Sequence, residues 1–426
     1  MSEQNIRLDL FDRIDKPVNK GFVAILALLA LAGAAAFVSM ISGEDPSRGW
    51  IIFHVNFLVF TGISLGAIIF TAAAFLSKAG WHGPLRRFAE GFVFFLPVSY
   101  LFYWIIVLFG KDYIFPWIGS HDPLVEAKRG YLNMPFLTFR GGFGLLVLYV
   151  TSWAFVRTSL RPDLRKIKDR LTGFRKSMAE RISAGWRGDE AEATALHRTR
   201  SRLAPSLVLI YVVVVTILSI DLVMSLAPTW FSTLFGAYFF MGAFLSGLAA
   251  TAIATVLLTR RYGLDDVVTK SQYHDLGKLM FGFSVFWAYL FWSQFLVVWY
   301  GNLPLETQFI VVRKFPIWQN LSIAVFLCLF LIPFWGLITR FAKMTPATHM
   351  LFAVVISFGF FIERFDLVVP SLNPTPDAFP FGIGELLVTL GYLSIFLLCY
   401  IAFMRTFPIV PIVGLKRKAE HASGNA

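Results

Sequence analysis

Apolar runs of about 20 residues recur along the whole chain, and they limit its possible folds more than any other feature. A helix of about 20 residues crosses the roughly 30 Å hydrocarbon core of a bilayer at about 1.5 Å per residue. The sequence therefore predicts an all-α integral membrane protein with about ten transmembrane helices. The predicted spans are 20–41, 51–76, 88–110, 134–158, 205–227, 232–258, 276–300, 317–339, 347–369 and 383–404.

Charged residues make up only 15% of the 426 residues, against about 25% in soluble domains. This composition excludes a soluble fold, a disordered tail and a nucleic-acid binder. Cys328 and Cys399 both lie in apolar runs, and the chain has no C-x-x-C-H motif and no cysteine cluster. We therefore expect no covalently bound haem, no iron–sulfur centre and no metal site in this chain. A cleavable signal peptide is not expected either, because the first apolar run is too long for a signal core.

The distribution of basic residues predicts the orientation. Of the 38 Lys and Arg residues, 30 lie in the termini and loops on one side of the predicted spans, and 6 lie in the loops on the other side. Because cytoplasmic loops are enriched in Lys and Arg, we place both termini in the cytoplasm. The basic segment 159–204 is the longest of these loops. We expect a surface helix over 165–181 that lies on anionic lipid, with docking to a partner as the alternative.

Two stretches of the chain resemble each other and indicate an internal repeat. Residues 221–229 read DLVMSLAPT, and residues 366–375 read DLVVPSLNPT with one residue inserted. Spans two to five and six to nine are then two parallel four-helix bundles with two flanking helices, although chance similarity remains an alternative. The predicted parts are an N-terminal segment with the first helix (1–50), a first bundle (51–227), a second bundle (228–370) and a last helix with a basic tail (371–426). Small residues at Gly62-x-x-x-Gly66 and Gly242-x-x-x-Ser246 predict close helix packing.

Ionisable groups inside a membrane cost several kcal/mol, so each one needs a structural or functional reason. Near the predicted periplasmic side the candidates for a proton path or a quinone site are His54, Arg140, Asp221, Gln294, Glu363, Arg364, Asp366 and Glu385. Near the cytoplasmic side the candidates are His274, Asp275 and Lys278. The centre of the bilayer is nearly free of charge.

Each candidate has a structural alternative. Asp221 lies seven residues before Pro228, inside the helix, where it either exchanges protons or forms a structural pair with Arg140. Glu363 and Asp366 share a helix face and need a cation such as Arg140 or a shared proton; the alternative is that Glu363, Arg364 and Asp366 simply reach the interface.

Two histidines leave similar alternatives open. His54 is either a hydrogen-bonded packing residue or a partner for a quinone carbonyl or a proton relay. His274 and Lys278 lie one turn apart, and they are either a proton entry or ordinary charge at a helix start.

Two motifs resemble those of a known family. Residues 219–233 (SIDLVMSLAPTWFST), and residues 275–304 from DLGKLMF through FWAY and SQ to WYGNLP, resemble polytopic subunits of alternative complex III in the NrfD/PsrC-like group. The similarity covers about residues 20–405 and is greatest to the F subunit. Three positions depart from the family pattern: Leu222 stands where Trp is common, Ala227 where Glu is common, and Leu305 where an acidic residue is expected.

The resemblance implies a subunit of a quinol:cytochrome c oxidoreductase in a bacterial inner membrane that is not catalytic alone. A multihaem cytochrome c subunit, an iron–sulfur subunit and a larger polytopic relative would be its partners, and the haems and clusters would lie in them. This chain would conduct protons or hold a second quinone. The sequence also leaves open a secondary transporter, which would carry charge near the midplane, and a purely structural scaffold of a respiratory complex.

Overall fold

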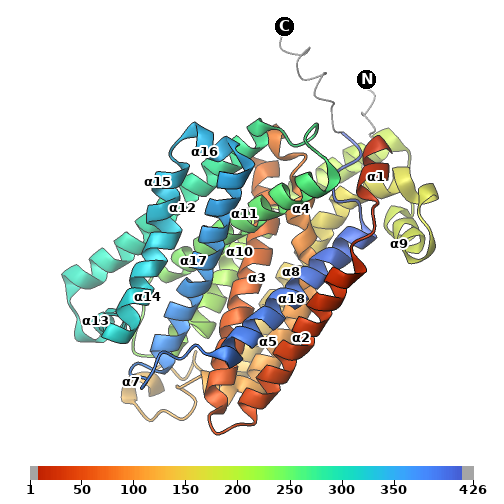
Figure 1. The fold of residues 1–426 in the computed structure, drawn as a ribbon. Helices are drawn as coiled ribbons and strands as arrows, with labels where there is room; N and C mark the ends of the chain where they lie inside the picture. The colour runs from red at the N-terminus through yellow and green to blue at the C-terminus, as the bar shows by residue number, and fades with distance from the viewer. Residues whose placement is uncertain (1–7, 415–426) are drawn as a thin grey trace.

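The computed structural model describes residues 8–414, and every regular element within that range is a helix (Figure 1). Nine helical segments in this range are long and apolar enough to cross a membrane, which confirms an all-α membrane protein. Six of the nine are each built on one long helix: α2 (Lys20–Ile41), α3 (Pro46–Leu76), α8 (Met134–Ile167), α10 (Asp189–Leu222), α11 (Phe235–Tyr262) and α12 (Lys270–Gly301). A seventh is α18 (Ile383–Thr406).

The other two spans are chains of short helices. The span Arg86–Ile114 runs through α4 (Arg86–Glu90), α5 (Leu96–Ile105) and α6 (Lys111–Ile114), with a 3-10 segment and a π segment between them. The span Pro316–Leu337 joins α14 (Pro316–Phe326) and α15 (Ile332–Leu337) through a π segment.

The ninth predicted span, 347–369, corresponds to α17 (Pro346–Leu372), which is not among the nine candidate membrane spans. This helix is 27 residues long and carries the buried charges Glu363, Arg364 and Asp366 in its second half. It packs against α3, α11 and α14 inside the bundle. It is the fourth helix of the second bundle.

The long helices pack as two four-helix bundles. In the first bundle α3 contacts α5 and α10, and α8 contacts both α5 and α10. In the second, α11 contacts α12 and α17, while α14 and α15 close the ring against α12 and α17. Helices α2 and α18 pack on each other and flank the first bundle through α3 (Figure 1).

Glycines allow the bundles to touch through their backbones. A Cβ atom added at Gly66 on α3 would lie 2.0 Å from the carbonyl oxygen of Ala243 on α11. One added at Gly247 would lie 2.2 Å from the backbone nitrogen of Ala67. Small residues are therefore required where α3 crosses α11, as expected for helices that pack closely in a membrane. Gly62 and Gly242 face other neighbours, Phe360 and the Glu363–Arg364 pair.

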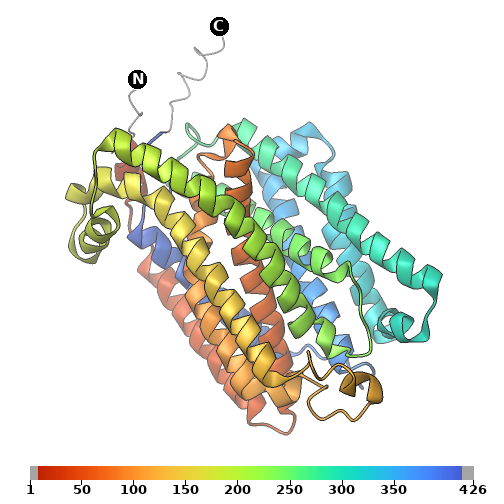
Figure 2. The same ribbon diagram turned by 180° about the vertical axis from the view of Figure 1, so that it is seen from behind.

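Segment 159–204 is mostly an extension of the transmembrane helices. Helices α8 and α10 lie side by side (Figure 2), and α9 (Gly173–Ser183), which follows α8 in the chain, packs against α8. The surface helix predicted over 165–181 is wrong in its bounds, because α8 runs to Ile167 and the chain turns before Gly173, which has a φ of +56°. That left-handed backbone suits glycine and ends the preceding turn.

Helix α1 (Leu8–Ile14) is docked on this extension by ion pairs. Asp12 accepts from Arg170 at 3.0 Å, and the carboxylate of Asp15, just after α1, accepts from Arg175 at 2.6 Å. Helix α1 and the last turn of α18 lie at the same end of the molecule, which we call the α1 end (Figure 1). The opposite end, which carries the short helices α7 (Pro123–Glu126) and α13 (Pro304–Val312), is called the α7 end. Which end faces the cytoplasm stays a prediction.

Candidate functional site

Asp221 and Arg140 form a closed ion pair in the first bundle. Asp221 lies in the last turn of α10, and Arg140 lies two turns into α8. Arg140 donates from Nε to Oδ2 of Asp221 at 2.6 Å and from Nη2 to Oδ1 at 2.5 Å, so both carboxylate oxygens are engaged. The guanidinium also lies 3.7 Å from the ring centroid of Tyr131. This is the fork geometry in which arginine binds carboxylates most strongly.

Tyr131 covers the Arg140–Asp221 pair from the loop before α8. Burial, the largest cause, together with the negative charge of Asp221, raises the pKa of Tyr131 to about 12. The phenol is therefore neutral at physiological pH. Its ring and backbone shield the pair, since the carbonyl oxygen of Tyr131 also accepts from Nη1 of Arg140 at 3.0 Å.

Asp366 and Arg313 form the corresponding pair in the second bundle. Asp366 lies near the end of α17, and Arg313 lies three residues before α14 begins. Their closest contact is 3.4 Å, from Nε of Arg313 to Oδ2 of Asp366, and Ser322 donates to Oδ1 at 3.0 Å. In both bundles, an aspartate at the end of the fourth helix thus meets an arginine near the start of the third. The arrangement agrees with the repeat read from the DLV motifs.

Glu363 and Arg364 are neighbours in sequence and form a buried pair. Nη1 of Arg364 lies 3.1 Å from Oε2 of Glu363, and Nε1 of Trp287 donates to Oε1 at 3.2 Å. Arg364 also donates to the carbonyl oxygen of Phe239 at 2.9 Å. Both side chains are at most 1% exposed, so they are buried among the helices and do not extend into solvent. Arg140 is not the cation of Glu363 and Asp366, since it is bound to Asp221.

A cavity of about 180 Å³ opens beside Asp366 in the second bundle. Gln294 from α12 and Ser322 from α14 line it together with Asp366 and Arg313. The rest of the lining is mostly apolar: Trp230, Tyr238, Phe291, Phe295, Val298, Phe309, Ile310, Lys314, Val325 and Leu367. The structure thus brings two sequence candidates, Gln294 and Asp366, to one cavity. Hydrogen-bonding groups in an aromatic wall are the usual features of a small-molecule site.

His54 and a set of hydroxyl groups occupy the interior of the first bundle. His54 on α3 donates from Nε2 to the carbonyl oxygen of Leu222 at 2.7 Å, next to Asp221 in the chain. Two turns further along α3, the hydroxyl of Thr61 lies 2.6 Å from that of Ser99. The hydroxyl of Ser99 in turn lies 2.8 Å from that of Tyr149. These buried hydroxyls form a connected polar group inside an otherwise apolar core.

A second buried charge cluster, which the sequence reading did not place among the sites, lies towards the α1 end. Arg87 donates to Glu90 at 2.8 Å and to the hydroxyl of Ser159 at 2.9 Å, and it also donates to Asp163. Asp163 accepts from the backbone nitrogens of residues 412 and 413, which fixes the segment after α18. Arg86 and Arg87 are adjacent in the sequence and look alike there, so the sequence does not reveal that Arg87 is the one that is fully buried.

The remaining sequence candidates lie apart from these clusters. Lys278 contacts Asp275 at 2.6 Å, and His274 lies 4.0 Å from Asp275, all in the first turns of α12 at the α1 end. Glu385 accepts from the backbone nitrogen of Gly382 at 2.8 Å and from Arg48 at 2.9 Å. Glu385 therefore caps the start of α18 and ties it to the start of α3.

Arg313 is not among the sequence candidates, because in the sequence it looks like an ordinary loop cation. The repeat could have found it. If Asp366 copies Asp221, and if Asp221 pairs with an arginine near the start of its third helix, then Asp366 needs a cation near residue 316. Arg313 fulfils that requirement.

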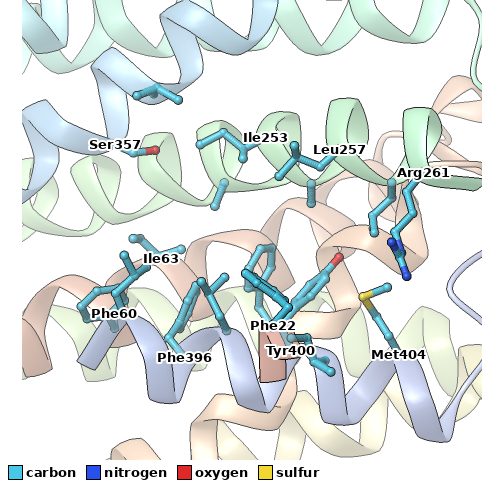
Figure 3. A pocket seen from close by; sticks show the side chains of 18 of the residues that line it. Phe22, Phe60, Ile63, Ile253, Leu257, Arg261, Ser357, Phe396, Tyr400 and Met404 are labelled. Atoms are coloured by element: carbon cyan, nitrogen blue, oxygen red, sulfur yellow. The ribbon is translucent and has the colours of Figure 1, made fainter. Parts of the chain in front are cut away.

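The largest cavity among those described is an apolar cleft of about 740 Å³ between the bundles, and none of the sequence candidates lines it. Phe60 and Ile63 of α3, Phe396 and Tyr400 of α18, and Ile253 and Leu257 of α11 face it from opposite sides (Figure 3). Arg261 lies at one end of the cleft. Such a lining suits a hydrocarbon chain.

Within residues 8–414, no group of three or more His, Cys, Asp or Glu side chains is placed to hold a metal ion. The two cysteines are free thiols on different helices.

A scan against protein-family models matches none of them, and a search of curated proteins finds no similar sequence. The helices and their burial support one conclusion about identity. The chain is a polytopic all-α integral membrane protein whose buried charges gather towards the two ends of its bundles.

Proposed function

We propose that this chain is a membrane-integral subunit of a quinol:cytochrome c oxidoreductase of the alternative complex III type. It would lie in a bacterial inner membrane with both termini in the cytoplasm. A multihaem cytochrome c subunit, an iron–sulfur subunit and a larger polytopic relative would be its partners and would carry the redox centres. The proposal draws on the resemblance of the Asp221 and α12 motifs and on the site in the second bundle.

The cavity beside Asp366 carries the proposal of quinol handling. Oxidation of a quinol releases two protons and two electrons, so its site needs a proton acceptor and a way out for electrons. Asp366 offers a carboxylate to a quinol hydroxyl, Gln294 offers an amide, and Phe291 and Phe295 offer aromatic edges or faces for the ring, whereas Phe309 is already stacked on Trp230 with ring centroids 3.9 Å apart. The electrons would pass to the redox centres of the partner subunits.

Asp366→Asn in the assembled complex should lower quinol-dependent cytochrome c reduction by at least about tenfold, because the amide cannot accept the proton. The matched control is Glu306→Gln, which changes a carboxylate on α13 that does not line the cavity. Purification through a tag on this chain should bring down haem and iron–sulfur proteins. A tagged chain that purifies alone, or an Asp366→Asn complex with full turnover, would refute quinol handling here.

Proton conduction through the first bundle is the second candidate function. It is favoured by the buried polar groups between the two ends: His54 near Asp221, then the hydroxyls of Thr61, Ser99 and Tyr149. Ser99→Ala removes the middle hydroxyl. If protons use this route, the variant should lower the number of protons moved per electron while quinol turnover continues.

The mutual pairing of the charges also supports the scaffold alternative. For a scaffold, neutral substitutions at these residues would reduce assembly, and they would not reduce turnover in complexes that do assemble. Measuring complex yield and turnover in the same preparation therefore separates the two functional proposals from a structural role.

A further inference from the structure

A cavity of about 240 Å³ lies at the α1 end, between α4, α8, α10 and residues 413–414. Its lining is rich in cations: Arg86 from α4, Lys166 from α8 and Arg200 from α10, with His197 one turn before Arg200. This cavity is separate from the site beside Asp366, and none of the sequence candidates lines it.

Arg200 is the central observation. It is only 9% exposed, and its Nε and Nη2 atoms have no hydrogen-bond partner among the described residues. Its guanidinium is held between two aromatic rings, 4.8 Å from the centroid of Phe75 and 5.0 Å from that of Phe155. A buried guanidinium with free N–H groups is costly unless an acceptor meets it. The side chain is therefore positioned but lacks its acceptor.

The carboxylates that line the same cavity are already engaged. Asp163 is bound by Arg87 and by two backbone N–H groups of the segment after α18. Asp189 accepts from Nζ of Lys166 at 2.6 Å and from Nε1 of Trp186 at 3.1 Å.

Glu90, the remaining acid nearby, is bonded to Arg87 at 2.8 Å, whereas Nε of Arg86 lies 3.9 Å from it, beyond hydrogen-bond distance. The positive charge of Arg200, and part of that of Arg86, is therefore left without a partner in the cavity.

We propose that this cavity binds a phosphate-type oxyanion through Arg200 and Arg86. Arginine presents two parallel N–H groups to phosphate and is the residue best suited to it. Arg86 opens the span Arg86–Ile114, and Arg200 lies five residues before the span 205–227 that the sequence predicts. In this proposal both arginines therefore lie at the level of the lipid phosphates. The oxyanion is either the phosphodiester of an anionic phospholipid or free phosphate.

The first experiment measures binding of inorganic phosphate to the purified full-length protein in detergent. The melting temperature should rise with sodium phosphate relative to sodium chloride at equal ionic strength. Arg200→Gln should weaken phosphate binding at least about tenfold, because a charge-assisted hydrogen bond is lost. Arg198→Gln is the matched control, since this exposed arginine on the same helix does not line the cavity.

The second experiment separates lipid from free phosphate. After a delipidating wash, native mass spectrometry should show phosphatidylglycerol bound to the wild type and to Arg198→Gln. The amount of this lipid bound to Arg200→Gln should be lower by at least about tenfold. If the protein retains the lipid but its melting temperature does not rise with phosphate, the ligand is a phospholipid. If the melting temperature rises with phosphate and no lipid is retained, the ligand is a free anion. Arg86→Gln should show the same losses and serves if Arg200→Gln does not fold. The proposal fails if folded Arg200 and Arg86 variants bind both probes as the controls do.

Discussion

Both bundles contain a buried aspartate–arginine pair, but the geometry of the pair differs between them. In the first bundle, Arg140 engages both oxygens of Asp221. In the second, Arg313 approaches one oxygen of Asp366 at 3.4 Å, and the carboxylate lines a cavity. The pair in the first bundle thus joins α8 to α10 with both carboxylate oxygens engaged, while the pair in the second bundle leaves part of the bonding capacity of Asp366 open to the cavity, as the proposed quinol site requires. Duplication lets a membrane protein keep a costly buried charge for stability in one place and for chemistry in another.

Removing the two arginines tests this difference most directly. Arg140→Gln leaves Asp221 buried without its cation and should cost about 3–5 kcal/mol of stability. Arg313→Gln should cost only about 1–3 kcal/mol, because Asp366 keeps Ser322 and faces a cavity. Thermal unfolding in detergent measures both. The double variant Arg140→Gln with Asp221→Asn should regain part of the loss, and equal losses for the two single variants would show that the bundles do not differ.

The joint between the bundles gives the next largest expected effect. Gly66→Ala places a methyl group 2.0 Å from the carbonyl oxygen of Ala243, so α3 and α11 must move apart at a cost of about 1–3 kcal/mol. Gly282→Ala is the control, because an added Cβ there meets nothing within 4 Å and should be neutral or slightly stabilising. The melting temperatures of the two variants should therefore change in opposite directions or by clearly unequal amounts.

A pH effect should come from the first bundle's α1 end. Burial, the largest cause, lowers the pKa of His82 from 6.5 to about 4, and the charges of Arg86 and Arg200 add to this while Glu90 opposes it. The unfolded chain binds the proton below pH 6.5 and the folded chain does not, so stability falls as pH drops from 6.5 towards 4. At pH 5.5 the loss should be about 1.4 kcal/mol. His82→Gln should flatten this part of the stability profile, and an unchanged profile would assign the effect to another group.

The hydrogen bond from Ser322 to Asp366 allows a smaller test of the difference between the two bundles. Ser322→Ala removes the hydroxyl that donates to Asp366 and should cost about 1 kcal/mol. The loss should stay small because the adjoining cavity gives the freed oxygen another environment. The unfolding midpoint in detergent, compared with that of Ser357→Ala on α17, reports the difference. A loss as large as that of Arg140→Gln would contradict an open site.

The sequence predicted the features that follow from long apolar runs and from single charged residues within them. The span 20–41 coincides with α2, and Arg140 was named as the structural alternative for Asp221. It could not predict how far α8 continues beyond the apolar stretch, because a charged helix outside the membrane carries no hydropathy signal. It also missed the large apolar cleft, since Phe60 and Phe396 look the same in sequence whether they fill a core or line a space. Cavities form where the surfaces of neighbouring helices do not fit together, and no local sequence pattern determines that fit.

The contact of α3 with α11 through Gly66 and Gly247 has a mechanical consequence. Carriers that work by alternating access rock one half of the molecule against the other around a central site. Where α3 crosses α11 at these glycines, the two halves meet backbone against backbone, so at that point there is no layer of side chains on which they could slide. The pair of bundles should therefore behave as one rigid frame, with any movement during turnover confined to side chains and to the short peripheral helices.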